Sequence, residues 1–346
     1  MSRKFFASLF LVLGMTLLTL EAVELVVGKL SITERLFPAL FDLAVALLLL
    51  WGYRRTRVHR RIGFGGGAML TVVLFFGLLV TAFSALVVYV DSALDGRTYA
   101  GVYDDCYKVW AARGLVEGGT DITHTGEQNS ITSISRAFAA GAKGVEVDVH
   151  FDAGQGIYIV SHDFPYNLKD GALLTLEALL EALPGVRYFW LDFKKMRHLD
   201  DKALAAAVDE LGRLERKFGL QGHFYVEGAA PFSLAAFQRA GFRTLFDIHP
   251  LNDDHALTPM VINLYKLVFY FGDFSVMGMN YFFRDSANPI YADRTRRLLA
   301  GIPVFIYHVP DDRAVLSDLS ADPSVRVILV VHHNLNRYAT TACASR

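Results

Sequence analysis

Two acidic residues, two positions apart, are the first sign of chemistry in this sequence of 346 residues. Glu146 and Asp148 lie in the run Gly144-Val145-Glu146-Val147-Asp148-Val149, which is typical of a β-strand. Because side chains alternate along a strand, both carboxylates are expected on one face. Two neighbouring carboxylates repel each other, and the pKa of one of them rises. A divalent cation removes this repulsion, and oxygen ligands of this kind suit Mg²⁺ or Ca²⁺.

A third carboxylate and a lysine end another predicted strand. In Trp190-Leu191-Asp192-Phe193-Lys194 the same alternation places Asp192 and Lys194 on one face. A metal and a lysine together can neutralise the charge that grows on phosphoryl oxygens during phosphate transfer. Taken alone, however, each pair has a simpler interpretation. A carboxylate pair is often a solvated strand face, and an aspartate near a lysine is often a plain ion pair.

Two histidines follow predicted strands near these acids. They are His124 and His162, and His162 is followed by Asp163. One histidine can deprotonate an attacking oxygen while the other protonates the leaving oxygen. A single histidine after a strand is more often a hydrogen-bonded structural residue. The ordered set of two histidines, three carboxylates and a lysine nevertheless predicts cleavage of a phosphate ester.

The elements that must position these residues alternate between short β-rich runs and helical stretches, which is the pattern of βα units. The predicted strands are Val116–Thr123, Val145–His150, Ile157–Ser161, Arg187–Phe193, His223–Glu227, Arg243–Ile248, Ser275–Met279, Val304–His308 and Val325–Val331. We expect Ile157–Ser161 to form a hairpin with its neighbour, which leaves eight strands. The predicted fold is therefore an α/β, TIM-type (β/α)₈ barrel with its active site at the carboxyl ends of the strands. A doubly wound open sheet is the alternative, but the sequence has no glycine fingerprint for a nucleotide.

The first ninety residues have a different character from the rest. The chain is 53% hydrophobic with a mean hydropathy of +0.32, and most long apolar runs precede the barrel. Three stretches approach the roughly 20 residues that a spanning helix needs: Phe5 to about Val27, Phe37 to about Tyr53, and about Ile62 to Val90. We therefore expect a three-helix membrane anchor in residues 1–90, a linker in 91–114 and the barrel in 115–346. Three buried core helices are the alternative.

The positive charges predict which side of the membrane the barrel occupies. The short loop between the second and third stretches is rich in arginine, with Arg54, Arg55, Arg57, Arg60 and Arg61. Such loops stay in the cytoplasm by the positive-inside rule, and Arg3 and Lys4 place the N-terminus on the same side. Three crossings then put the barrel outside the cytoplasm. In an oxidising compartment the two cysteines, Cys106 and Cys343, either form a disulfide or remain as two thiols.

Residues 120–195 resemble the glycerophosphodiester phosphodiesterase family, within the wider phospholipase-C-like phosphodiesterase superfamily. The matching motifs are His124-x-Gly126, Asn129, Ala137-Phe138, Gly141-Ala142-x-Gly144-Val145-Glu146-x-Asp148-Val149, Val160-x-His162-Asp163, Leu174-Thr175-Leu176-Glu177 and Leu191-Asp192-Phe193-Lys194. The resemblance implies that His124 and His162 are the acid/base pair. It also implies that Glu146 and Asp148 hold a divalent metal, with Asp192 as the third ligand. Lys194, Asn129, Glu227 and Tyr307 are the predicted substrate-binding residues.

The sequence departs from the family in three places. Thr125 stands where the usual His-Arg-Gly motif has an arginine that would contact phosphate, and Asp192 stands where a glutamate is usual. The segment between Asp163 and Thr175 is also short. The aspartate and the short segment are more like the sphingomyelinase D and phospholipase D toxin branch, which acts on membrane lipids.

These observations together predict the function and the partners. We expect a membrane-anchored, metal-dependent phosphodiesterase that hydrolyses glycerophosphodiesters or phospholipid headgroups. The alternatives are a phospholipase-D-type or sphingomyelinase-D-type lipid-cleaving enzyme and a catalytically inactive, membrane-bound binding module. The expected partners are the substrate and the lipid bilayer. With a net charge of -1 the chain has no basic field for nucleic acid, so we expect no nucleic-acid partner.

Overall fold

The computed structural model describes residues 64–116, 127–169, 171–183, 185–282, 289–310, 312–330 and 338. The chain divides into two compact units, Met1–Gly96 and Arg97–Arg346. The first and second predicted membrane spans lie outside the described residues, and so does His124.

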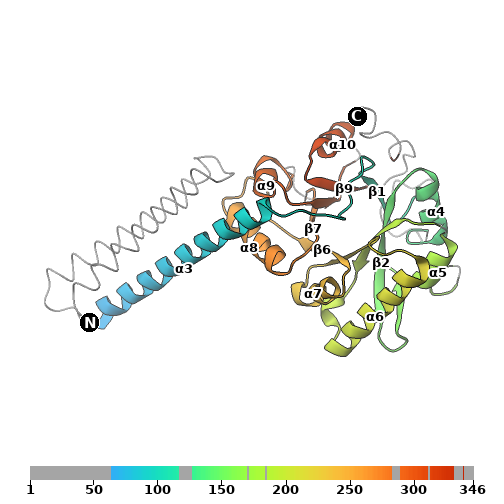
Figure 1. Cartoon of the computed structure of the whole chain (residues 1–346), viewed down its shortest axis with the longest axis horizontal. Coiled ribbons are helices and arrows are strands. Elements are labelled where there is room, and N and C mark those ends of the chain that lie inside the picture. Colours follow the sequence, from blue (N-terminus) through green and yellow to red (C-terminus); the bar gives the residue numbers. More distant parts are fainter. Residues whose placement is uncertain are drawn as a thin grey trace. The chain divides into compact units, whose positions relative to one another are not determined.

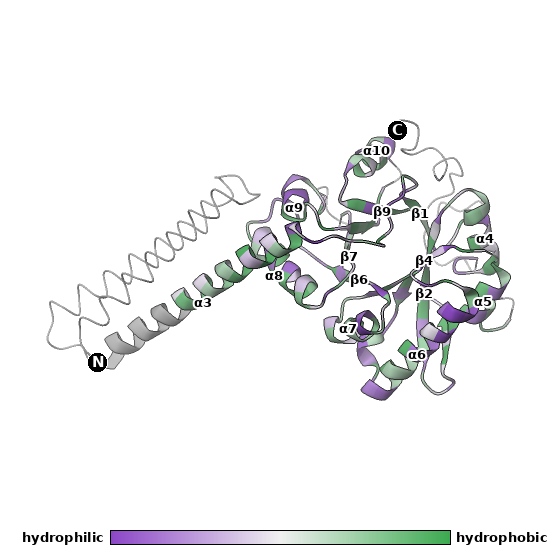
Figure 2. Cartoon of the chain, in the orientation of Figure 1, coloured by the Kyte–Doolittle hydropathy of each residue, from purple (hydrophilic) through white to green (hydrophobic). Residues whose placement is uncertain are grey.

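The described residues of the first unit form one long helix. Helix α3 (Phe64–Asp95) is a proline-free, mostly apolar run, and much of the part of it that Figure 2 colours is green. Its part Gly77–Asp95 is long and apolar enough to cross a membrane, which by itself is weak evidence for a span. The helix coincides with the third predicted stretch. Membrane anchoring therefore stays a prediction.

A closed parallel barrel forms the second unit (Figure 1). Its strands are β1 (Val109–Ala112), β2 (Gly144–Asp152), β4 (Tyr188–Phe193), β5 (Phe224–Gly228), β6 (Arg243–Ile248), β7 (Val276–Asn280), β8 (Val304–Tyr307) and β9 (Val325–Val330). Each strand is parallel to the next, and β1 pairs with both β2 and β9, which closes the sheet. Strand β3 (Ile157–Val160) runs antiparallel to β2. The predicted eight-stranded barrel with an additional hairpin strand is confirmed.

Helices lie on the outside of the strands (Figure 1). They are α4 (Ile131–Ala139), α5 (Leu176–Ala182), α6 (Asp201–Phe218), α7 (Pro231–Arg239), α8 (Thr258–Phe271), α9 (Asp293–Leu298) and α10 (Arg313–Ala321), with a short 3₁₀ helix η1 (Met196–His198) after β4. The longest of them, α6, has ordinary boundaries. The Asp200 carboxylate accepts a hydrogen bond from the backbone N–H of Ala203, and Gly219 ends the helix in a left-handed conformation.

Aromatic side chains fill the barrel interior below its mouth. Trp110, Trp190, Tyr225 and Phe305 are fully buried and pack against one another. A Cβ atom on Gly144 would lie 2.4 Å from the Trp110 ring, so this glycine lets the indole approach the backbone of β2. These aromatic side chains leave no room for polar groups in this part of the barrel. The polar residues of the strands lie at the opposite, carboxyl-terminal end.

The first strand lies earlier than the sequence predicted. We placed it at Val116–Thr123, whereas β1 spans Val109–Ala112 and therefore lies within the segment assigned as linker. Residues 117–123 of the predicted run lie outside the described residues. As the first strand of the barrel the prediction was wrong, because it passed over a short run that is wholly buried. Strands of a parallel barrel are covered on both faces, so continuous apolar runs are their signature. Cys106, just before β1, is disulfide-bonded, and Cys343 lies outside the described residues.

Candidate active site

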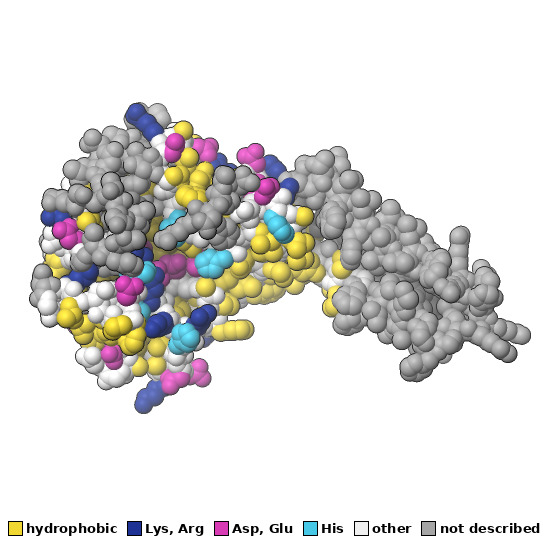
Figure 3. All heavy atoms as spheres, turned by 180° about the vertical axis from the view of Figure 1, so that it is seen from behind, with side chains coloured by type: hydrophobic (Ala, Val, Ile, Leu, Met, Phe, Trp, Pro, Cys, Tyr) yellow, Lys and Arg dark blue, Asp and Glu magenta, His cyan; other side chains and the backbone are white. Residues whose placement is uncertain are grey.

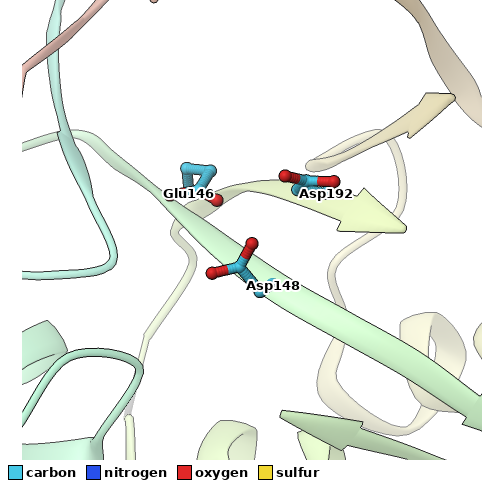
Figure 4. A group of neighbouring side chains, drawn as sticks. All are labelled: Glu146, Asp148 and Asp192. Carbon is cyan, nitrogen blue, oxygen red and sulfur yellow. The ribbon is translucent and has the colours of Figure 1, made fainter. Parts of the chain in front are cut away.

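Three carboxylates meet at the carboxyl ends of β2 and β4. Glu146 and Asp148 point from β2, and Asp192 comes from the neighbouring strand, where it is the direct register partner of Asp148 (Figure 4). One oxygen from each of the three lies within 4.8 Å of the others. Glu146 and Asp148 are buried. The structure thus brings together the three residues that were predicted as metal ligands.

Two cations hold the central carboxylate. Lys194 Nζ lies 2.8 Å from one Asp148 oxygen and also pairs with Asp192, while Arg113 Nε lies 2.9 Å from the other Asp148 oxygen. Asn129 reinforces this arrangement, since its side-chain amide donates to Asp148 Oδ2 at 2.7 Å and its oxygen accepts from the Asp148 N–H. The neighbouring Ser130 caps α4. Asn129 is thus available for the carboxylate.

The three carboxyl groups have different proton affinities. Burial opposes ionisation of Asp148, but Lys194 and Arg113 outweigh it and the pKa is lowered. Burial and the nearby Asp148 charge raise the pKa of Glu146 well above its usual range. Burial also raises the pKa of Asp192 to about 6, although Lys194 acts in the opposite direction. The cluster therefore resists full ionisation until another cation is present.

This donor set fits a hard divalent cation. Mg²⁺ holds oxygen ligands at about 2.1 Å and Ca²⁺ at about 2.4 Å, so two oxygens on opposite sides of one ion lie about 4.2 or 4.8 Å apart. The 4.8 Å within which the three carboxylate oxygens lie is of this size. A bound ion would also supply the positive charge that the buried carboxyls Glu146 and Asp192 require before both can ionise.

The next strands, β5 and β6, carry further carboxyls, and Glu227 is the direct register partner of Asp192. Glu227, on β5, accepts a hydrogen bond from Trp190 Nε1 at 2.5 Å. Asp247, on β6, accepts one from the Tyr307 hydroxyl at 2.8 Å, and His249 Nε2 lies 3.3 Å from its other oxygen. Burial raises the pKa of both carboxyls. Figure 3 shows acidic, basic and histidine side chains gathered on the face in view.

The two predicted acid/base histidines differ in what the structure describes. His162 follows β3, and its Nδ1 lies 2.7 Å from Asp163 Oδ1, which orients the ring. His124 lies outside the described residues. A further histidine, His150, follows Glu146 and Asp148 in the alternation of β2 and is buried against Tyr166. Burial lowers the pKa of His150, while a hydrogen bond to the backbone of His162 acts in the opposite direction.

An arginine that was not among the predicted site residues follows β1 and reaches the carboxylates. Arg113-Gly114 follows Ala112 directly, and the Arg113 backbone N–H donates to Glu146 Oε2 at 3.0 Å. Gly114 has a φ of +85°, and a Cβ there would lie 2.6 Å from Ser133. The close packing at Gly114 thus accompanies an Arg113 that contacts both Glu146 and Asp148. An Arg-Gly pair directly after a buried apolar run was the signal that could have revealed this.

The comparisons with known proteins found similar chains among solved structures. No protein-family model and no curated protein matches the chain. Among solved structures, a glycerophosphodiester phosphodiesterase from Parabacteroides distasonis is 20% identical and covers 64% of this chain and 91% of its own, with a TM-score of 0.44. For the enzyme from Thermotoga maritima the values are 16%, 66%, 95% and 0.45, and for that from Agrobacterium tumefaciens 17%, 67%, 99% and 0.42. These structures bear the name of the family that the motifs resemble.

Proposed function

We propose that this chain is a membrane-anchored, metal-dependent phosphodiesterase that hydrolyses glycerophosphodiesters or phospholipid headgroups outside the cytoplasm. The observation that carries the proposal is the arrangement around Asp148. Its neighbours Glu146 and Asp192 offer oxygens within 4.8 Å, and Lys194 and Arg113 lie on either side of it. Such a site presents a cation-binding group and two positively charged side chains to one small volume, as a phosphodiester requires.

Glu146, Asp148 and Asp192 would hold the metal. A divalent ion bound there would polarise a phosphoryl oxygen and orient the diester. Lys194 would contact the non-bridging oxygens, since its ammonium already lies between Asp148 and Asp192. Arg113 would hold the same phosphate from the side of β1. Both cations then stabilise the additional negative charge of the transition state.

Proton transfer is assigned to His162 and His124. The Asp163 carboxylate holds Nδ1 of His162 and stabilises the imidazolium that forms when the ring accepts a proton at Nε2. His124 is the proposed partner of His162. One of the two histidines takes a proton from the attacking oxygen, and the other gives a proton to the leaving oxygen. A diester whose leaving group carries a neighbouring hydroxyl could react internally and give a cyclic phosphate.

A second candidate function is a binding module that retains a phosphodiester without cleaving it. Thr125 favours this alternative, because it stands where the family's His-Arg-Gly motif has its arginine. A binding module has no use for His162 or for its contact with Asp163. The two candidates therefore differ in whether His162 affects a chemical rate.

The test is turnover by the full chain in detergent or in nanodiscs. Glycerophosphodiesters and lysophospholipids are offered with Mg²⁺, with Ca²⁺ or with EDTA, beside His162→Ala and the surface control Asp209→Asn on α6. Metal-dependent cleavage that is lost in His162→Ala and kept in the control supports the proposal. Release of glycerol phosphate from a glycerophosphodiester indicates glycerophosphodiester hydrolysis, whereas release of the headgroup alcohol from a lysophospholipid, with the phosphate left on the lipid, indicates the phospholipase-D-type alternative. Metal binding without turnover of any diester favours the binding module.

A further inference from the structure

The outer face of α8 is apolar and carries no exposed charge. Lys266 is the one Asp, Glu, Lys or Arg residue in the sequence of this helix, and it is buried. Four large apolar side chains at or just before the helix are instead exposed: Leu257 by 44%, Met260 by 46%, Leu264 by 46% and Phe271 by 64%. Exposed hydrophobic residues gathered on one helix mark a contact surface more often than scattered ones do.

These side chains form a single stripe. At roughly 100° per residue, the four exposed positions fall within an arc of about 60°. Ile262, Lys266 and Phe269, all buried, fall on the opposite side. The helix thus packs on the barrel with one face and presents a second apolar face outward.

Helix α6, in the same outer ring, shows what an ordinary solvent face looks like. Its sequence is rich in charge, and exposed residues such as Arg213 and Lys217 pair with Glu177 on α5. Figure 2 shows the corresponding hydrophilic segments of α6 in purple. The outer face of α8 therefore differs from the charged outer face of α6.

We propose that the outer face of α8 lies against the lipid bilayer that α3 anchors. This inference rests on the membrane anchoring contained in the proposed function. Arg97, the first residue of the barrel unit, indicates that the bilayer is what covers this face. Arg97 forms an ion pair with Asp273 at 2.8 Å, donates to the backbone oxygen of Phe274 at 3.3 Å and lies over the Phe269 ring. Arg97 is thereby fixed at the C-terminal end of α8.

Because the chain is continuous, the bilayer that α3 would enter must lie close to this end of the barrel. Helix α3 ends at Asp95, and two peptide units span at most about 7.6 Å, so Asp95 cannot lie far from Arg97. The point at which the chain would leave the membrane is accordingly close to Phe271, the most exposed member of the stripe. A second copy of the chain or a soluble partner has no such covalent reason to meet this face.

The experiment places a fluorescent label on the stripe in the full chain. The described residues contain no free cysteine, so Leu264→Cys offers a selectively reactive thiol, and Asp209→Cys on α6 is the matched control. The labelled proteins are reconstituted in nanodiscs that contain lipids with a quencher just below the headgroups, because interfacial helices insert about 5–10 Å. We expect several-fold stronger lipid quenching at 264 than at 209. High salt should not change it, since the face carries no charge.

Two results would overturn the proposal. Equal quenching of both labels by a water-soluble quencher would show that α8 faces solvent, and thiol cross-linking between copies at 264 would show that a second chain covers it. Neither result depends on catalysis. Resistance of the wild-type chain to alkaline extraction from membranes tests the anchor separately, and metal-dependent turnover tests the enzyme.

Discussion

One carboxyl group distinguishes the two regions of the barrel mouth, since Glu146 and Asp192 have raised pKa values like the carboxyls on β5 and β6, whereas the pKa of Asp148 is lowered. On the side of β1, β2 and β4, Asp148 is fully buried yet keeps a lowered pKa, because Lys194 and Arg113 contact it. On the side of β5 and β6, Glu227 and Asp247 have raised pKa values. Their hydrogen-bond donors are uncharged, a tryptophan N–H and a tyrosine hydroxyl.

The difference shows where an anion and a cation can be handled together. A buried carboxylate that is ionised attracts a metal ion through its negative charge. The adjacent lysine and arginine attract a phosphate through their positive charges. A cation bound beside Asp148 would lower the raised pKa values of Glu146 and Asp192, whereas Glu227 and Asp247 accept hydrogen bonds from Trp190 and Tyr307. We therefore assign metal and phosphate to the first side and the rest of the substrate to the second.

The largest expected effect comes from Asp148→Asn. Without this charge Lys194 and Arg113 lose their common partner and the metal loses its central ligand, so we expect activity to fall to the level without metal. The melting temperature of the metal-free protein should also fall, because removal of one partner of a buried ion pair leaves charges uncompensated. Activity assays and thermal unfolding check both. Normal metal-dependent turnover in a folded Asp148→Asn protein would remove Asp148 from the site.

Glu146→Gln separates metal binding from stability. Since burial already raises the pKa of Glu146 well above its usual range, a neutral amide resembles its state in the metal-free protein. We expect an unchanged or raised melting temperature without metal. The additional stabilisation by Mg²⁺ or Ca²⁺ should be lost, and turnover should fall by about 10- to 100-fold or more. A loss of stability as large as that of Asp148→Asn would contradict the distinction between the two carboxyls.

The pH dependence of metal binding should reflect Asp192. Its pKa of about 6 in the folded protein lies above its ordinary value of 3.8. Between these values the unfolded chain ionises while the folded chain stays protonated, so the metal-free protein loses stability as pH rises through this window. Metal binding has the opposite trend, because the ligand must be ionised, and affinity should rise up to about pH 6. Calorimetric titrations at several pH values, with Asp192→Asn as the comparison, measure this. A flat profile would contradict the assignment.

The smallest expected effect is that of Glu227→Gln on β5. The amide keeps an acceptor for the Trp190 N–H and removes a charge that burial disfavours. We expect metal affinity close to wild type and turnover reduced by less than about tenfold, as is common when one neutral hydrogen bond is altered. Steady-state kinetics with metal titration check it. If Glu227→Gln abolished metal binding, both sides of the mouth would belong to one metal site.

Much of the site follows from short-range pattern. The two-residue alternation in Glu146-x-Asp148 and in Asp192-x-Lys194 places each pair on one face of a strand, whatever the rest of the fold does. The alternation of β and α segments likewise predicted the barrel. The sequence did not reveal that Arg113 belongs beside Asp148 or that Asp247 acts on Asp192, because these residues are far apart along the chain and meet only when the strands pair in the barrel.

The sequence by itself determined which side chains share a strand face and which segment is apolar enough to meet lipid, because both are consequences of local repeat and composition. The tertiary structure alone decided where the first strand lies, which cations neutralise Asp148, and which face of α8 is left uncovered. These depend on burial. Burial is set by the packing of residues distant in sequence, and it also determines which carboxyls at the mouth of this barrel remain charged.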